Sequence, residues 1–166
     1  MNSLSQNRDQ QDAENSSALP PNTVTFHLTS DPKLLKVVRL VVAHLCDLAG
    51  FPEAQRHRAT LAVDEACANI IRHAYEGATD RPVIITARLI DNGIEVVLRD
   101  FGKKADVEKI KSRELDDIRP GGLGVHLMQS AMDEVVFDNT LPEGNQLTLI
   151  KYLPQFRSDT HEEVVP

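Results

Sequence analysis

Residues 83–100 read VIITARLIDNGIEVVLRD and carry the clearest structural signal in the sequence. Two apolar, β-branched runs, 83–90 and 94–100, flank the turn Asp91-Asn92-Gly93. An Asn-Gly pair between two such runs is a strong hairpin signal, because both residues tolerate the positive φ that a tight turn requires. The stretch therefore predicts two strands that pair antiparallel.

The segments on either side of this hairpin extend the prediction to a whole domain. Alternation of apolar and polar residues, or short apolar runs, predicts further strands over 23–29, 134–139 and 146–153. Helical periodicity and end signals predict helices over 32–49, 52–75 and 124–132. Strands that follow one another through hairpins imply a mainly antiparallel sheet with the helices on one face. The fold class predicted is α+β, a two-layer α/β sandwich.

The predicted helix 32–49 has apolar residues on nearly every side. One side is expected to cover the sheet. The other side is either a dimer or partner interface or is buried within the domain, and the sequence leaves both alternatives open.

Three stretches contain few apolar residues. Residues 1–22 and 157–166 are predicted to be a disordered and a flexible tail, because they cannot bury enough apolar surface to offset the entropy of ordering. Residues 23–156 then form one domain. The stretch 102–122 is polar and rich in Lys, Asp and Glu, and is interpreted as a mobile cover.

Composition argues against several functional classes. The chain has 166 residues and a net charge of −7, without a Lys/Arg run that defines a basic face, so direct nucleic-acid binding is not expected. Neither a signal peptide nor an apolar stretch of bilayer length is found, which predicts a cytoplasmic protein without membrane contact. Cys46 and Cys67 are expected to be buried free thiols, and no structural zinc is expected.

Residues 61–75, LAVDEACANIIRHAY, form the first block with chemical potential. At about 100° per residue, Glu65, Asn69 and Arg72 share one stripe of the helix, with His73 beside it. The carboxylate could act as a base and the amide oxygen as a ligand for a hard cation such as Mg²⁺. On these residues alone, the solvent-exposed face of an amphipathic helix explains the stripe more simply.

Residues 96–102, VVLRDFG, form the second block. Asp100 at the end of a buried strand could accept a hydrogen bond from the exocyclic amine of adenine, and Gly102 would let the backbone approach the ring closely. An ordinary Asp-x-Gly turn is the simpler interpretation of these residues by themselves.

Residues 119–128, RPGGLGVHLM, form the third block. A glycine cluster that leads into an apolar helix leaves unpaired N–H groups at the positive end of the helix dipole, which suits a phosphate. The block is not a Walker A loop, because no Gly-Lys-Ser/Thr follows it, and it does not follow a strand as a dinucleotide fingerprint would.

The order of the three blocks resembles the GHKL ATPase superfamily and, within it, the anti-sigma-factor serine kinases. The stretches that carry the resemblance are DEACANIIRHAYE (64–76) and GGLGVHLMQSAMDEVVF (121–137), and the resemblance covers about residues 23–153. It implies the Bergerat, or histidine-kinase-like ATPase, fold, with ATP and Mg²⁺ between the helical layer and a flexible lid over 103–119.

The resemblance also implies a role for individual residues. Glu65 would be the catalytic base for a serine hydroxyl, Asn69 would hold Mg²⁺, and Asp100 would read the adenine. Arg72 is a further expected neighbour of the phosphates. The implied nucleotide-binding residues are Asn69, His73, Asp100, Gly102, Lys104, Arg119, Gly122, Leu123, Gly124 and Asn145.

Two of these positions depart from the pattern of the resembled proteins. Lys104 stands where a second glycine is usual, and its side chain is expected either to crowd the nucleotide or to reach a phosphate. Asn145 stands after Gly144 where many superfamily members have Thr, and it can still donate and accept hydrogen bonds.

The function implied is that of an ATP-dependent serine protein kinase and anti-sigma factor. Its partners would be a STAS-domain antagonist, which it phosphorylates, and a sigma factor, in a partner-switching system, and it would be a homodimer. One alternative is an ATP-binding anti-sigma or interaction module with little kinase activity. A second is the catalytic domain of a histidine kinase, which would need a phosphoacceptor histidine on a long upstream helix that residues 1–22 cannot form.

Overall fold

One sheet organises the part of the chain that the computed structural model describes, residues 20–106 and 123–156. Its strands are β1 (Thr23–Thr29), β2 (Pro82–Ile90), β3 (Gly93–Asp100), β4 (Glu134–Asp138) and β5 (Asn145–Tyr152). Their spatial order is β1-β2-β3-β5-β4, and every neighbouring pair runs antiparallel. The hairpin predicted over 83–100 is confirmed as β2 and β3.

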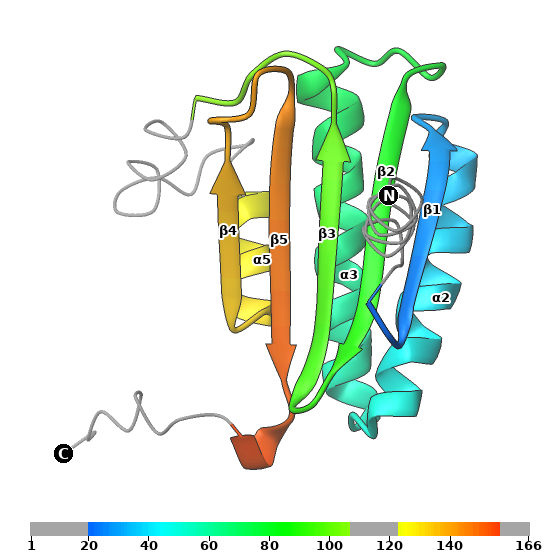
Figure 1. Ribbon diagram of the computed structural model, residues 1–166, viewed down its shortest axis with the longest axis vertical. Helices are drawn as coiled ribbons and strands as arrows, with labels where there is room; N and C mark the ends of the chain where they lie inside the picture. Colours follow the sequence, from blue (N-terminus) through cyan, green and yellow to red (C-terminus); the bar gives the residue numbers. More distant parts are fainter. Residues whose placement is uncertain (1–19, 107–122, 157–166) are drawn as a thin grey trace, which may run out of the picture.

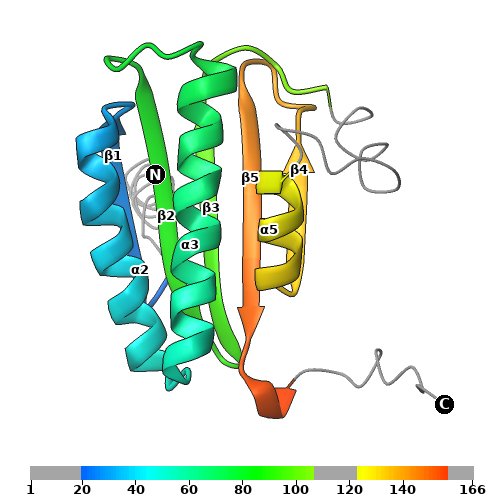
Figure 2. The same ribbon diagram turned by 180° about the vertical axis from the view of Figure 1, so that it is seen from behind.

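The helices α2 (Leu35–Ala49), α3 (Glu53–Asn69) and α5 (Leu123–Ala131) all cover the same face of the sheet (Figures 1 and 2). Figure 2 shows α2 over the β1 side, α3 over the middle and α5 over β5 and β4. The predicted α+β two-layer sandwich is therefore confirmed, with element boundaries close to those expected.

The core lies between the sheet and this helical layer. On β3, the buried side chains Ile94, Val96 and Leu98 alternate with residues on the open face. Because side chains alternate along a strand, Asp100 falls on the same face as Leu98. The last residue of β3 thus places a carboxylate at the end of the apolar core, between the sheet and α3.

The predicted helix 52–75 does not remain α-helical to its end. It changes after Asn69 into a π-helical turn, η2 (Ile70–Ala74), in which the Tyr75 N–H donates to the Ile70 carbonyl at 3.0 Å. The Ala74 carbonyl then accepts a hydrogen bond from the Lys103 N–H at 2.9 Å. The wide turn fits into the fold because the segment after β3 supplies a hydrogen-bond donor to this carbonyl group.

The first predicted helix is also corrected at two points. Its first turn is a 3₁₀ turn, η1 (Pro32–Leu34), and α2 follows it. Full burial of its apolar surface is wrong, because Val37, Leu40 and Leu48 are 44%, 64% and 62% exposed. The opposite side of α2 is buried against the sheet, as predicted, and the free thiols Cys46 and Cys67 are buried.

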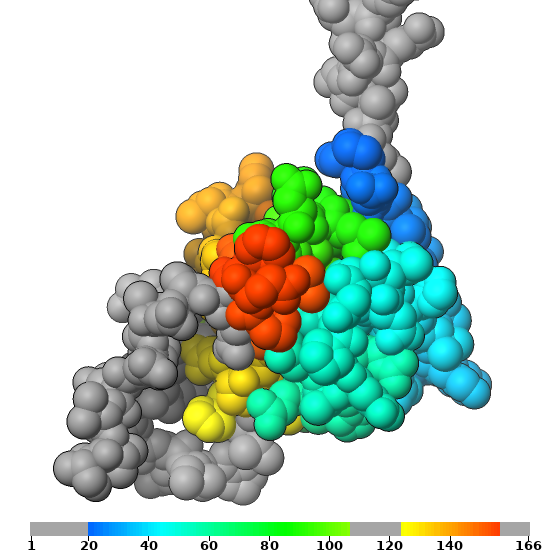
Figure 3. Space-filling view, turned by 90° about the horizontal axis from the view of Figure 1, so that it is seen from below, coloured from blue at the N-terminus to red at the C-terminus, as the bar shows by residue number. Residues whose placement is uncertain are grey.

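After β5 the chain turns into the short 3₁₀ helix η3 (Pro154–Phe156). The Leu153 N–H donates to the Asn92 carbonyl at 2.8 Å, which holds this segment beside the β2–β3 turn (Figure 3). Among the described residues, no helix has the length and apolar content needed to cross a membrane. The predicted tails, apart from residues 20–22, and most of the predicted cover lie outside the described residues.

Candidate functional site

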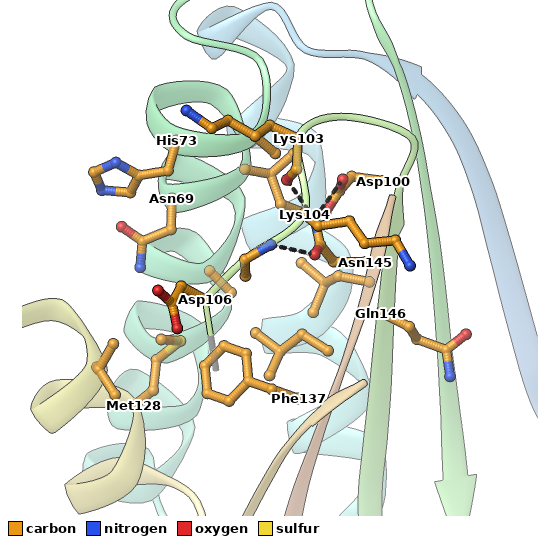
Figure 4. Close-up of a pocket in the computed structure, with 17 residues that line it drawn as sticks. Asn69, His73, Asp100, Lys103, Lys104, Asp106, Met128, Phe137, Asn145 and Gln146 are labelled. Carbon is orange, nitrogen blue, oxygen red and sulfur yellow. Dashed lines mark hydrogen bonds between the residues drawn. The ribbon is translucent and has the colours of Figure 1, made fainter. Parts of the chain in front are cut away.

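A cavity of about 500 Å³ lies between the sheet, α3 and α5, at the end of β3 (Figure 4). Its inner wall is apolar and comes from the core: Ala66, Ile70, Ala74, Leu98, Val125, Met128, Phe137 and Leu147. Its polar side chains are Asn69, His73, Asp100, Lys103, Lys104, Asp106, Asn145 and Gln146. A mostly apolar cavity of this size with a few convergent polar groups is the usual form of a small-molecule site.

Asp100 is the buried charged group of this cavity, with only 4% of its surface exposed. Its Oδ1 accepts hydrogen bonds from the Gly102 N–H at 2.9 Å and from the Asn145 amide at 3.0 Å. Burial raises the pKa of the Asp100 carboxyl above its ordinary value, and the two hydrogen bonds oppose that rise. A carboxylate with remaining acceptor capacity at an apolar wall can recognise a flat ligand that presents an N–H group.

The loop after β3 is fastened to the end of the helix by backbone contacts. A Cβ atom on Gly102 would lie 2.3 Å from the Ala74 carbonyl oxygen, so only glycine fits between the loop and η2. The Tyr75 hydroxyl accepts from the Phe101 N–H at 2.8 Å and donates to the Pro82 carbonyl at 2.5 Å. Gly102 therefore permits close packing against the helix, which in turn fixes the orientation of Asp100.

Asn145 joins the same loop to the start of β5. Its amide nitrogen also donates to the Lys103 carbonyl at 3.0 Å, and its oxygen accepts from the Ala105 N–H at 2.7 Å. The predicted hydrogen-bonding capacity of Asn145 is thus used on both sides of its amide, between Asp100 and the loop (Figure 4).

Lys104 lines the cavity, and the expectation that it crowds the nucleotide or reaches a phosphate stays a prediction. Its ammonium donates to the carbonyl oxygens of Asn139 and Leu141, at 2.8 and 2.5 Å, in the segment that links β4 to β5. The side chain extends away from Asn69 and His73 (Figure 4). Lys104 therefore anchors the loop to the β4–β5 connection.

Glu65 and Asn69 lie on one stripe of α3, as the helical periodicity predicted. Arg72 joins them: its Nη2 donates to Glu65 Oε1 at 2.8 Å and to Asn69 Oδ1 at 3.2 Å. Asn69 lines the cavity, whereas Glu65 lies one turn earlier and does not. The side chain of Glu65 is 26% exposed, so a second molecule could reach its carboxylate.

Gly124 lies in the first turn of α5, directly against Glu65. A Cβ atom at this position would be 2.1 Å from Glu65 Oε1 and 2.8 Å from its Cδ. The carboxylate therefore lies at the positive end of the α5 dipole, which attracts negative charge. The missing side chain of Gly124 is what makes room for the carboxylate there.

The structure thus brings together most of the residues that the sequence singled out. Asn69, His73, Asp100, Lys104 and Asn145 line one cavity, Gly102 adjoins it, and Glu65 and Gly124 contact each other beside it. Arg119 and Gly122 lie outside the described residues. Leu123 begins α5, and its side chain is also outside the description.

Sequence reasoning missed several residues of this site. Tyr75 and Asn139 position the loop after β3, and Asn139 donates from its amide to the Ala105 carbonyl at 3.1 Å. Lys103 and Asp106 also belong to the cavity wall. Tyr75 follows Ala74 in the first block and could have been found there; the others lie in polar segments without a distinctive pattern.

Comparison with known proteins places this geometry in a family. Residues 28–151 match the family described as histidine kinase-like ATPase domain. The chain belongs to this family. The match begins near the end of β1 and ends one residue before the end of β5. It includes every described residue of the ATPase-domain cavity.

Curated relatives of this ATPase domain carry the name serine-protein kinase RsbW. The protein of that name from Bacillus subtilis is 27% identical over 144 residues, which cover 82% of this chain and 89% of the relative. Those from Oceanobacillus iheyensis and Staphylococcus epidermidis are 25% and 28% identical, over 86% and 78% of this chain and 94% and 86% of theirs. The predicted resemblance to the GHKL superfamily and its serine kinases is therefore confirmed.

The residues of the cavity fit an adenine nucleotide with a divalent cation. The apolar wall and the buried Asp100 carboxylate suit a flat base with an exocyclic amine. Within the described residues, no group of three or more His, Cys, Asp and Glu side chains could hold a metal ion by itself. Mg²⁺ is commonly held by one or two protein oxygens together with the phosphates of a substrate. The amide oxygen of Asn69, which lines the cavity, is a ligand of that kind.

Proposed function

We propose that this protein is an ATP-dependent serine protein kinase and anti-sigma factor that phosphorylates a STAS-domain antagonist. The observation that carries the proposal is the convergence of a buried carboxylate, Asp100, and an amide oxygen, Asn69, on one cavity, with the carboxylate of Glu65 one helical turn outside it. The names of the relatives support a serine as the acceptor.

The division between the cavity and Glu65 is what phosphoryl transfer to a second protein requires. The nucleotide must be held inside, and the base must reach a hydroxyl that arrives from outside. Asn69 lines the cavity, while Glu65 is partly exposed beside the first turn of α5. A serine hydroxyl near Glu65 would then lie within about one helical turn of the metal ligand Asn69.

Each described residue has a defined task in this reaction. ATP would supply the phosphoryl group, and a bound Mg²⁺ would neutralise charge on it. Glu65 accepts the proton of the serine hydroxyl while the bond between the serine oxygen and the γ-phosphorus forms and the bond from that phosphorus to the β,γ-bridging oxygen breaks, leaving ADP. Asn69 supplies one oxygen for the metal, and the first-turn N–H groups of α5 attract the phosphates.

The partners belong to the same proposal. The acceptor would be the unphosphorylated STAS-domain antagonist, which competes with a sigma factor for the kinase, and phosphorylation would release it. We also propose a homodimer. Support for a protein interface comes from the apolar side chains of Val37, Leu40 and Leu48, which α2 exposes. Light scattering on a size-exclusion column would show the dimer, and a monomer at all concentrations would remove this part of the proposal.

The kinase proposal is tested with purified protein, Mg²⁺, labelled ATP and a STAS-domain protein from the same organism. Transfer of acid-stable label to the STAS protein is expected, and Glu65→Gln should abolish transfer while it leaves nucleotide affinity within about twofold of the wild type. Glu53→Gln is the matched control, because Glu53 lies on the same helix, far from Asn69, and is 89% exposed. It should transfer label normally.

Four results would count against the proposal in different ways. Undiminished transfer by Glu65→Gln would remove Glu65 as the base. Nucleotide binding without transfer would favour the alternative of an ATP-binding interaction module. Acid-labile label would point to a histidine acceptor, and failure of the wild-type protein to bind any adenine nucleotide would overturn the kinase and the module together.

A further inference from the structure

The guanidinium group of Arg72 contacts both side chains to which the proposed function gives the decisive roles. Nη2 of Arg72 donates to Glu65 Oε1 and to Asn69 Oδ1, at 2.8 and 3.2 Å, and Nε donates to the Ala68 carbonyl at 3.3 Å. One cation therefore joins the candidate base to the candidate metal ligand.

The position of Arg72 in the sequence explains how it reaches both. It follows Glu65 by seven residues and Asn69 by three, so the three side chains lie on one stripe of the helix. Helical side chains lean toward the N-terminus of their helix, which directs the long arginine side chain back over the preceding turns. The contact to the Ala68 carbonyl holds the base of the guanidinium in that direction.

The oxygens that Arg72 contacts are those that a hard divalent cation prefers, a carboxylate and an amide. A guanidinium and Mg²⁺ cannot both lie close to the Asn69 oxygen without strong mutual repulsion. The side chain of Arg72 is 55% exposed, so it has space to move when another cation approaches.

We propose that Arg72 is a positioning residue that takes the place of the metal when no nucleotide is bound, and that Mg²⁺-nucleotide displaces its guanidinium from Asn69. This inference rests on the proposed function. While it is bound to both side chains, Arg72 holds the oxygens of Asn69 and Glu65 in place. After displacement the carboxylate of Glu65 becomes available to an acceptor hydroxyl.

The proposal predicts opposite effects of the arginine charge on two forms of the same ligand. With Mg²⁺ present, Arg72 competes with the metal for Asn69 and so weakens binding. Without metal, its positive charge lies near the place of the phosphates and so strengthens binding. Loss of the charge should therefore tighten binding of Mg²⁺-ADP and weaken binding of ADP alone. A side chain that only supports the fold would change both affinities in the same direction.

The test measures the dissociation constant of ADP by calorimetry, once with saturating Mg²⁺ and once with EDTA. ADP undergoes no transfer, so kinase activity does not enter the result. For Arg72→Met, each constant should change by about two- to fivefold, in opposite directions, as expected for a half-exposed charge. Arg72→Lys keeps the charge and should keep the ratio of the two constants within about twofold of the wild type.

Arg81→Met is the matched control. Arg81 is 59% exposed and pairs with Asp80 at 3.3 Å, and it is not part of the cavity wall. Neither dissociation constant should change. Circular dichroism and thermal unfolding would show that each variant is folded, and Arg72→Gln would replace Arg72→Met if the methionine variant were not.

A parallel loss of both affinities in Arg72→Met would overturn the proposal, because Arg72 would then contact the phosphates in both states. Unchanged constants would overturn it as well. If the wild-type protein bound ADP in neither condition, the proposed function would fail too. In the nitrogen-15 spectrum, the Nε signal of Arg72 should shift on addition of Mg²⁺-ADP, and a signal that does not move would contradict displacement.

Discussion

Asp100→Asn is the substitution that separates nucleotide recognition from stability most clearly in this protein. The two side chains have nearly the same shape. An asparagine that keeps its oxygen at the Oδ1 position would still accept from the Gly102 N–H and the Asn145 amide, which now donate at 2.9 and 3.0 Å. It would lose only the longer contact of 3.2 Å from Asn145 to Oδ2, where its own NH₂ group would lie.

The effect on nucleotide affinity follows from this NH₂ group. In the proposed complex, the exocyclic amine of adenine would meet a donor where the wild-type protein presents a carboxylate. A hydrogen bond to a charged partner contributes about 1.5–3 kcal/mol, which corresponds to a dissociation constant about ten- to a hundredfold weaker. Calorimetry with ADP and Mg²⁺ would measure it.

The effect on stability should have the opposite sign. Burial raises the pKa of Asp100, so the folded protein holds this proton more tightly than the unfolded chain. The contribution of Asp100 to stability is therefore fully present below the ordinary carboxyl pKa of 3.8 and is lost as the pH rises through the raised value. Asparagine cannot ionise, so Asp100→Asn should unfold at the same or a higher temperature at neutral pH, with a flatter pH dependence above the ordinary value.

Asp91→Asn makes the same change of charge in the exposed turn at the other end of the β2–β3 hairpin, and should change neither nucleotide affinity nor the pH profile. If Asp100→Asn bound ADP as tightly as the wild type, Asp100 would not be the adenine acceptor. If it bound weakly but also unfolded at a lower temperature, the carboxylate would be needed to hold the loop, and the reasoning above would be wrong.

Three further predictions follow from glycine contacts and from buried thiols. Gly124→Ala should fold but transfer phosphate at least about tenfold more slowly, because its Cβ would be 2.1 Å from the oxygen of Glu65 and would displace that flexible side chain. Gly144→Ala should lower the free energy of unfolding in urea by at least about 2 kcal/mol, since φ here is +61° and a Cβ would be 2.1 Å from a backbone oxygen; a smaller loss would contradict the contact. Burial raises the pKa of Cys46 and Cys67 to about 12, so both should resist iodoacetamide at pH 8 in the folded protein and react once it is unfolded.

The sequence was sufficient for the fold because its signals were local and agreed with one another. The Asp-Asn-Gly signal predicted the pairing of β2 and β3, although Gly93 itself pairs with Ile90 and the turn residues are Asp91 and Asn92, and alternation along β3 predicted which face Asp100 occupies. The π-helical turn after Asn69 was not predictable in this way. It depends on a hydrogen bond from Lys103, far along the chain, to the Ala74 carbonyl, and nothing in the residues of the turn itself reports that partner.

The same limit applies at the site. The sequence compares Lys104 with the glycine that is usual at its position, and it does not report the two carbonyl groups of the β4–β5 connection that the Lys104 ammonium contacts. Carbonyl acceptors belong to the backbone and leave no trace in the identity of residues such as Leu141. Contacts between a side chain and a distant backbone group are therefore the ones that a single sequence conceals most completely.

Arg72, in contrast to Lys104, has side-chain neighbours that the sequence did predict. Helical periodicity placed it on the stripe of Glu65 and Asn69, and the structure confirms that placement. Helical periodicity predicts which side chains are neighbours, but not whether they contact one another or a bound ligand. A stripe with an acid, an amide and a base can neutralise itself or bind a metal and phosphates, and both arrangements use the same oxygens. In the proposed exchange, which one is populated would depend on the concentration of Mg²⁺-nucleotide, so the choice would belong to the equilibrium between the protein and its ligand rather than to the chain alone.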